Sequence, residues 1–165
     1  MVDEELERRH QRRELGPGNP KVGMTVIVKT ITRLTVSLIA LFGIYIVVNG
    51  HLTPGGGFAG GVIIALSFIH LVLAYGREEA LKVFPKKAIS IIESIGALSF
   101  LAIALLGFTG GYFFLNFLHK GEPFSLFSAG IIPLANCAIA LKVGAGLFAI
   151  FVVLVGFKMN RRSDK

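Results

Sequence analysis

The chain has 165 residues, 53% of them hydrophobic, and it contains several apolar runs close to 20 residues long. Runs of this length match the hydrocarbon core of a bilayer, about 30 Å at about 1.5 Å per residue, so they indicate membrane spans rather than the helices of a soluble core. The formal net charge of +7 comes from Lys and Arg that cluster beside these runs, which argues against a nucleic-acid-binding face and favours one small integral membrane bundle.

The amino-terminal segment is charged and polar. Residues 1–15 alternate acidic and basic side chains, and residues 16–20 (GPGNP) would stop any helix. The first 23 residues are too charged to form the apolar centre of a signal peptide, so we expect the amino terminus to be retained. We interpret residues 1–23 as a charged cytoplasmic leader, either an extension without specific chemistry or a docking segment for a partner subunit.

The first predicted span covers residues 30–49, and two basic residues, Lys29 and Arg33, lie one turn apart at its inner end. Long basic side chains reach the membrane interface at low cost, so we favour snorkelling for both, with a role in an ion path as the alternative. The second predicted span covers residues 58–75 and is followed by a basic loop.

The third predicted span covers residues 88–113 and ends in aromatic side chains, which are typical of a membrane interface. A long connection follows at 118–135, and its apolar segment 131–134 would lie against the membrane or dip into it. The fourth predicted span covers residues 138–157 and precedes a basic tail. The predicted divisions of the chain are the leader 1–23, a four-span membrane domain 24–160 and a cytoplasmic tail 161–165.

The distribution of charge predicts the orientation of the spans. Five Lys and Arg lie in residues 1–23, four lie between the second and third spans, and four follow the fourth span, whereas the other two loops hold none and one. Because basic residues are enriched in cytoplasmic loops, this bias predicts that both termini are cytoplasmic. Residues 51–61 then lie on the outer side of the membrane.

Two charged residues fall inside the predicted spans, Glu93 in the third and Lys142 in the fourth. Charged groups at such depths are costly and usually face protein or a water-filled path. Each lies on a helical face of small residues, so we expect both to face protein. In the functional interpretation they are relay or gating charges of a cation path. The alternatives are a carboxylate at the inner interface for Glu93 and a snorkelling side chain for Lys142.

The predicted span boundaries also place these two charges relative to each other. Counted from the ends of their spans, Glu93 lies close to the inner surface and Lys142 close to the outer surface. In a core about 30 Å thick, about 16 Å of depth would separate them. We therefore expect no direct pairing of Glu93 with Lys142 within one chain, and partners from water, backbone or other subunits.

Histidine and cysteine give no metal-binding pattern. His70 lies in the second span, where a lone histidine most often makes an interhelical hydrogen bond and a proton relay is the alternative. His51 and His70 would be about 28 Å apart along a helix, so they cannot share a metal. The one cysteine, Cys137, excludes an internal disulfide. No nucleophile–base spacing appears, which disfavours a membrane-embedded enzyme.

Glycine and proline make up six of the eleven residues 51–61 (HLTPGGGFAGG). Thr53 and Pro54 predict a helix start, a hydroxyl cap followed by proline at the first helical position. Consecutive glycines then disfavour the helix by about 1 kcal/mol each relative to alanine, so they need another reason. Gly57 and Gly61 are spaced for close contact with a neighbouring helix. A second, compatible interpretation is a partly unwound segment whose backbone lines an ion path.

The string from Gly50 to Gly61 closely resembles the signature of the B subunit of Mrp-type multisubunit sodium/proton antiporters. In that family, histidine-x-threonine-proline, three glycines and phenylalanine join the first two of four spans. The resemblance extends to span count, chain length and the basic loop after the second span, covering about residues 25–158 but not the leader. The matching residues are His51, Thr53, Pro54, Gly55, Gly56, Gly57, Phe58, Gly60 and Gly61.

The resemblance implies an all-α subunit of the plasma membrane that works beside A-, C- and D-like membrane subunits and lipid, with Na+ and H+ as transported ions and no cofactor of its own. The same subunit type occurs in relatives of respiratory complex I, the membrane-bound hydrogenases and sulfur-reducing complexes of anaerobic archaea, where a redox arm drives the membrane module. The resemblance names no ion ligand and does not choose between these hosts.

We therefore expect a non-catalytic transport subunit. The ion-path candidates are Glu93, Lys142 and His70, and we expect the glycine-rich stretch to shape the outer interface with neighbouring subunits. The rival hypothesis is a purely architectural subunit without direct ion contacts, which would tolerate charge substitutions but not bulky side chains at Gly57 or Gly61.

Overall fold

The computed structural model describes residues 26–118, 121 and 128–163 of the chain, so the predicted leader lies outside the described residues. Every regular element in this part is helical, and four helices are long and apolar enough to cross a membrane, which confirms the predicted fold class. The elements are α2 (Val26–Val48), α3 (Gly56–Tyr75), α4 (Arg77–Val83), α5 (Lys86–Leu106), the 3-10 turn η1 (Gly107–Gly110) and α6 (Ile132–Ser163).

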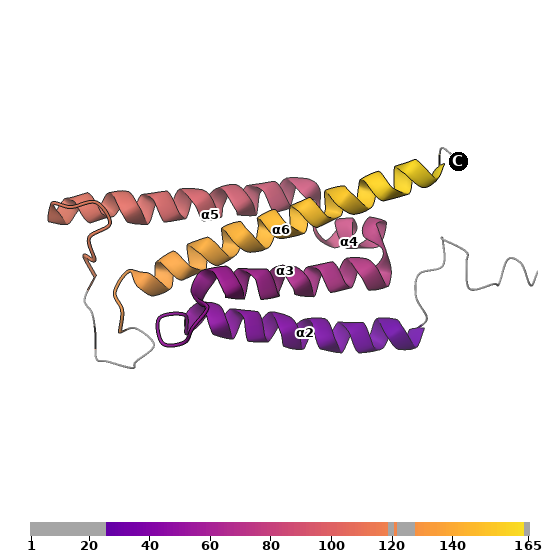
Figure 1. Ribbon diagram of the computed structural model, residues 1–165, viewed down its shortest axis with the longest axis horizontal. Coiled ribbons are helices and arrows are strands. Elements are labelled where there is room, and N and C mark those ends of the chain that lie inside the picture. The colour runs from indigo at the N-terminus through magenta and orange to yellow at the C-terminus, as the bar shows by residue number, and fades with distance from the viewer. Residues whose placement is uncertain (1–25, 119–120, 122–127, 164–165) are drawn as a thin grey trace, which may run out of the picture.

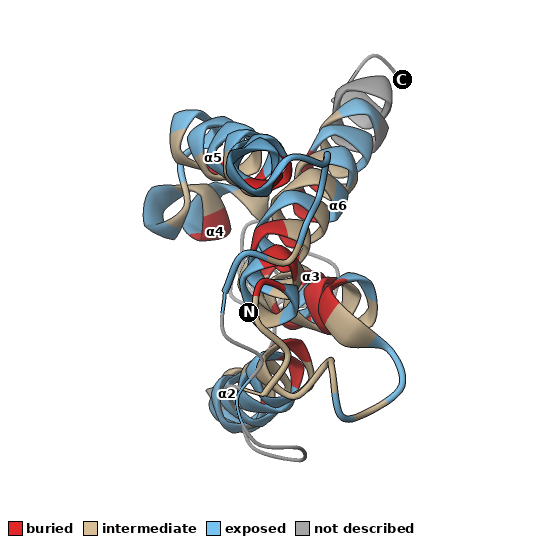
Figure 2. Cartoon of the chain, turned by 90° about the vertical axis from the view of Figure 1, so that its left-hand side faces the viewer, coloured by how far each residue is buried: buried red, intermediate tan, exposed pale blue. Residues whose placement is uncertain are grey.

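The four long helices lie side by side in the order α2, α3, α6, α5 (Figure 1). α3 packs against α2 and α6, and α6 packs against α3 and α5, while α2 makes only a small contact with α6. The end-on view shows that buried residues gather where these helices meet, while much of the outer surface of α2 and α5 is exposed (Figure 2). The chain is therefore an open layer of helices whose edges are free to meet lipid or other subunits.

A buried apolar cluster anchors α4 to the layer. It gathers where α3 ends and α5 begins, and the Phe68 ring lies 4.7 Å from the Phe84 ring and 5.8 Å from the Phe148 ring, centroid to centroid. Inside a membrane the alternative to this packing is lipid rather than water, so van der Waals contact between these side chains is the main favourable term. The fully buried members of the cluster are Val72, Ala80, Ile89, Phe148 and Val152.

The basic segments converge at one end of the layer. The Tyr75 hydroxyl, at the end of α3, donates a hydrogen bond to the Lys29 carbonyl oxygen near the start of α2 (3.1 Å), and the Lys29 ammonium lies 5.7 Å from the centroid of the Tyr75 ring. Helix α4, the start of α5 and the end of α6 lie at the same end (Figure 1). This arrangement agrees with the topology derived from charge, and the orientation across the membrane stays a prediction.

The fourth long helix begins earlier than predicted. α6 starts at Ile132 rather than at residue 138, so the apolar segment 131–134 forms the entry and first turn of a span instead of a dipping loop. Pro133 is compatible with this position because the first turn of a helix has backbone N–H groups without intrahelical partners. With this earlier start, every later residue of α6 lies farther along its span, and so deeper in the membrane, than predicted.

The side chain of Asn116 holds the entry to α6. Its Oδ1 accepts a hydrogen bond from the Ile131 N–H (3.1 Å), and its Nδ2 donates to the Ala129 carbonyl oxygen (3.3 Å). Between them, Gly130 adopts a φ of 63°, a left-handed conformation that glycine reaches without steric penalty. Asn116, at the other end of the long connection, thus stabilises the turn through which the chain enters α6.

The third span ends earlier than predicted. α5 stops at Leu106 instead of residue 113, and η1 extends the apolar run to Gly110, giving a candidate span of 25 residues. Gly111, with a φ of 100°, ends the helical path. The aromatic side chains that follow are exposed, as expected for residues at a membrane interface.

An apolar groove of about 380 Å³ is formed jointly by the four long helices. Side chains from α2, α3, α5 and α6 line it, and Phe84 lines it from the segment between α4 and α5. Cys137 also lines the groove and is otherwise exposed. Glu93 and Lys142 are not among the lining residues, so these two charges open onto a different surface.

Candidate functional site

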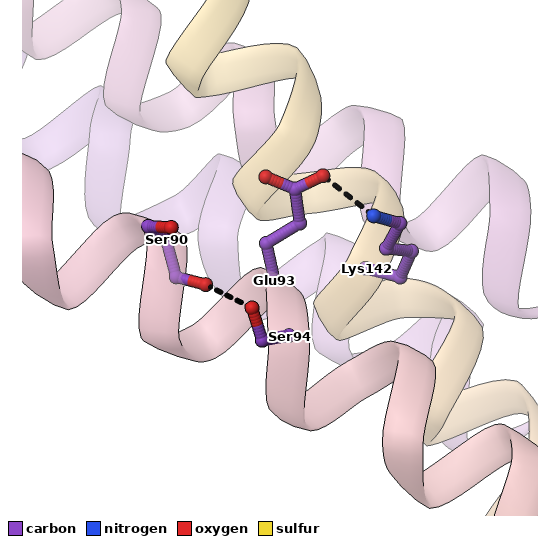
Figure 3. A network of polar contacts seen from close by, with 4 residues as sticks. All are labelled: Ser90, Glu93, Ser94 and Lys142. Carbon is purple, nitrogen blue, oxygen red and sulfur yellow. Dashed lines mark hydrogen bonds and ion pairs between the residues drawn. The ribbon is translucent and has the colours of Figure 1, made fainter.

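Glu93 and Lys142 form a direct ion pair between α5 and α6. The Lys142 Nζ donates a hydrogen bond to Glu93 Oε1 at 2.5 Å (Figure 3). The prediction that these residues do not pair within one chain was therefore wrong. Because α6 starts at Ile132, Lys142 lies about 15 Å into its span, and Glu93 lies about 10 Å into α5 from the opposite end. In a core about 30 Å thick, the two depths differ by only about 5 Å, which the side chains bridge.

Helix packing places this pair near the middle of the layer. On α6, Lys142 lies between Ala140, which contacts Gly61 of α3, and Phe148, whose ring contacts Phe68 of α3. Gly61 and Phe68 bracket the middle of the 20-residue helix α3. The ion pair therefore lies well inside the spans, with Lys142 about 15 Å and Glu93 about 10 Å from the nearer ends of their helices.

The ion pair is open on one side. The side chain of Lys142 is 48% exposed and that of Glu93 is 32% exposed, although each is the other's partner. Gly146 lies beneath the carboxylate, where even an added Cβ would be 3.7 Å from Glu93 Oε1. Ser90 and Ser94 lie nearby on α5, but the Ser94 hydroxyl donates to the Ser90 carbonyl oxygen (2.8 Å) rather than to the pair (Figure 3). The two charges thus face each other and a surface that the described residues leave uncovered.

His70 lies apart from the ion pair. Its side chain is exposed on α3, and among the described residues it makes no hydrogen bond or ion pair. The expected interhelical hydrogen bond is therefore not made within this part of the chain, and a partner for His70 would have to come from elsewhere. The described residues also contain no group of three or more His, Cys, Asp or Glu that could hold a metal.

The helix start in the glycine-rich stretch differs from the prediction. α3 begins at Gly56 after Gly55, whose φ is 118°, and no side chain of its own caps it. The Thr53 hydroxyl instead donates to the Asn49 carbonyl oxygen (3.0 Å), which closes the turn after α2. The prediction that Thr53 caps the helix and Pro54 is its first residue was therefore wrong. The Thr53 hydroxyl is used in the turn, and Gly55 and Gly56, both with positive φ, lead into α3.

Asn136 of α6 takes the place of a cap for α3. Its Oδ1 accepts a hydrogen bond from the backbone N–H of Gly57 (3.1 Å), one of the first-turn amides that have no partner within their own helix. Its Nδ2 is buried without a hydrogen-bond acceptor among the described residues. The sequence interpretation missed Asn136 because this residue falls between the predicted connection 118–135 and the predicted span 138–157. The available signal was a lone amide side chain three residues after Pro133 in an apolar run.

The motif glycines allow close contact on two sides of α3. A Cβ at Gly57 would overlap the backbone of α6, and a Cβ at Gly60 or Gly61 would lie 2.9 Å from a carbonyl oxygen of α2 or α6. This confirms the predicted close packing at Gly57 and Gly61, but the neighbours are helices of the same chain rather than another subunit. His51 is half-buried in the preceding turn, and Pro54 and Phe58 are exposed. The contacts pair Gly57 with Asn136, Gly61 with Ala140, and Gly60 with Gly43 and Val47.

Loss of the Asn136 side chain should loosen the start of α3. We expect Asn136→Ala to lower the free energy of unfolding by about 1 kcal/mol, because the Gly57 N–H loses its acceptor. The midpoint temperature at which this chain leaves its purified complex would report the loss. Ser94→Ala is the control, since its hydroxyl bonds only a carbonyl within α5. Equal midpoints for the two variants would contradict the capping role.

Comparison with protein families and curated sequences identifies related proteins. A family model described as "Domain related to MnhB subunit of Na+/H+ antiporter" matches residues 27–149. An uncharacterized protein of Methanocaldococcus jannaschii is 41% identical over 130 residues, covering 74% of this chain and 49% of that protein. The putative antiporter subunit mnhB2 of Staphylococcus aureus strain Newman is 42% identical over 73 residues, 44% of this chain and 51% of that protein.

A solved structure is also similar. A chain in the structure of the membrane-bound sulfane sulfur reductase, an archaeal respiratory membrane complex, matches with a TM-score of 0.69 and 31% sequence identity. The match covers 83% of this chain and 60% of that chain. This chain spans about half the length of the curated relatives named above. The glycine-rich stretch and the ion pair both lie within the residues that match the family model.

Proposed function

This chain belongs to the family of domains related to the MnhB subunit of Na+/H+ antiporters, and from this premise we propose that it serves as a small subunit of an Mrp-type sodium/proton antiport module. It is a multi-pass membrane protein of an antiporter-related family. The similarity to a putative antiporter subunit supports a place in a stand-alone antiporter, and the similarity to a chain of the sulfane sulfur reductase supports a place in a redox-driven complex. Its partners would be other Mrp-type membrane subunits, with the redox chemistry, where present, in separate subunits.

The observation that carries a transport role is the ion pair at mid-depth. A lone charge at this level is unfavourable, so opposite charges in the middle of spans are retained mainly where ions or protons pass. Lys142 neutralises Glu93 at rest, and the open side of the pair leaves the ammonium room to swing away. Glu93 would then be free to accept a proton or Na+, and the return of Lys142 would expel it. The pair would thus work as a gate beside a cation route.

Single substitutions of the pair test this proposal. We expect Glu93→Gln and Lys142→Met, each introduced into the full complex, to lower Na+-dependent proton movement in inside-out vesicles to near background, because either change removes the exchangeable contact. Native gel electrophoresis would establish how much assembled complex each vesicle sample contains. Ser94→Ala, adjacent to Glu93, should transport normally. Wild-type rates per assembled complex in both charge variants would refute the gate.

The packing of α3 favours a second candidate, a purely architectural subunit. Three motif glycines bring α3 into close contact with α2 and α6, so the most distinctive stretch of the chain serves its own fold. In this account, the chain holds larger transport subunits in register and touches no ions. It makes the opposite prediction for the charge variants, whose complexes would transport at the wild-type rate.

A further inference from the structure

The ammonium group of Lys142 has more N–H donors than the described residues offer it acceptors. A lysine ammonium carries three N–H donors, and one of them is used by Glu93 Oε1 at 2.5 Å. Among the described residues no second acceptor bonds Nζ, and the other carboxylate oxygen of Glu93 receives no hydrogen bond. The pair is therefore neutral in charge but incomplete in hydrogen bonding on its open side.

Lipid cannot complete the pair. Hydrocarbon tails offer no acceptors, so an unpaired N–H directed at them is strongly unfavourable. Snorkelling would not relieve this, because Lys142 lies about 15 Å from the nearer end of its span, beyond the reach of a lysine side chain. The exposed side of Lys142 must consequently meet a polar group of another molecule.

The surface around the pair suits a helix. Ser90 and Ala97 lie three residues before and four residues after Glu93 on α5, so both are on its side of the helix, and both are exposed. Together with Gly146 on α6 they surround the charges with small side chains, which allow a neighbouring helix to approach closely. Lys142 is the more exposed of the two charges, so the seam, the surface where α5 and α6 meet at this pair, presents mainly a positive group.

We propose that the seam of α5 and α6 at Glu93 and Lys142 is the docking surface for a membrane-spanning helix of another subunit, and that this helix carries a carboxylate which accepts a hydrogen bond from Lys142. A carboxylate matches the charge of the exposed group and forms the stronger, charge-assisted bond. Lys142 would then lie between two acids, one from each subunit, and the site stays neutral when one of these acids is protonated. The inference relies on the proposed function only in that the chain works within a multisubunit complex.

Site-specific photo-cross-linking in the intact complex tests this surface. A benzophenone amino acid at Ala97, on the Glu93 side of α5, should form an adduct with a membrane span of another subunit. Mass spectrometry should locate that adduct within about one helical turn, about 3.6 residues, of an Asp or Glu. The matched control is the same probe at Ile95, which is 50% exposed and does not share that side. It should not form this adduct.

A double-mutant cycle identifies the acid. Replacement of the cross-linked Asp or Glu by its amide and Lys142→Met should lower the dissociation temperature of the complex non-additively, since both remove one contact. Adducts at Ala97 with lipid alone, a span without an acid, or strict additivity would overturn the proposal. If the docking proposal fails in one of these ways but Glu93→Gln still impairs transport, the proposed gate is unaffected. If the Ala97 probe forms the expected adduct but Glu93→Gln and Lys142→Met transport at the wild-type rate, the docking surface is supported and the gate is refuted.

Discussion

Gly57→Leu should prevent the chain from forming its helical layer and remove it from its complex. The new Cβ would overlap the backbone of Asn136, which cannot rotate aside as a flexible side chain can. Overpacking of a close contact typically destabilises by about 1–3 kcal/mol, and the lost Gly57–Asn136 hydrogen bond adds about 1 kcal/mol. We expect little or no full-length chain to co-purify with its partners.

Gly144→Ala is the matched control for Gly57→Leu. Gly144 is buried in α6 and faces the same helix α3, but a Cβ there would lie 3.4 Å from the Gly61 carbonyl oxygen, an ordinary van der Waals distance. Alanine also favours a helix over glycine by about 1 kcal/mol, so this variant should be neutral or stabilising. Equal yields of complex from Gly57→Leu and Gly144→Ala would contradict the close-packing account of the motif.

Removing both charges of the ion pair should restore assembly without restoring transport. Lys142→Met alone leaves Glu93 as an unpaired charge inside the membrane, and insertion scales give such a charge an unfavourable free energy of about 2.5–3.5 kcal/mol. In Glu93→Gln combined with Lys142→Met, this chain holds no charge at that depth. We therefore expect more assembled complex from the double variant than from Lys142→Met alone, as native gel electrophoresis would show.

The class of the fold and its number of spans could be predicted because they depend on length and hydropathy alone. The ends of the spans could not be predicted as closely, and the start of α6 shows why. Pro133 is compatible both with the end of a loop and with the first turn of a helix. Whether the helix starts before or after it depends on Asn116, which bonds the Ile131 N–H from 15 residues away. A span start that is fixed by a distant side chain leaves little local signal.

The members of the candidate site could be named from the sequence, but their partners could not. Glu93 and Lys142 stand out as charges in apolar runs, and Gly57 and Gly61 by their spacing. Their pairing depends on the spatial order α2, α3, α6, α5, which brings the third and fourth spans together and separates the first from the third. No periodicity within a single span contains that order. For the same reason, the spacing of Gly57 and Gly61 predicts a close contact with a neighbouring helix but does not identify that helix as α6.

Na+-dependent proton movement by complexes that contain the double variant Glu93→Gln/Lys142→Met is the most direct test of the central claim. Purified complexes would be reconstituted into liposomes, and the initial rate of internal pH change after a Na+ step would be normalised to assembled complex. If the pair gates a cation route, the double variant assembles but transports near background. Assembly together with wild-type transport would show that the pair only joins two helices, and would contradict the account.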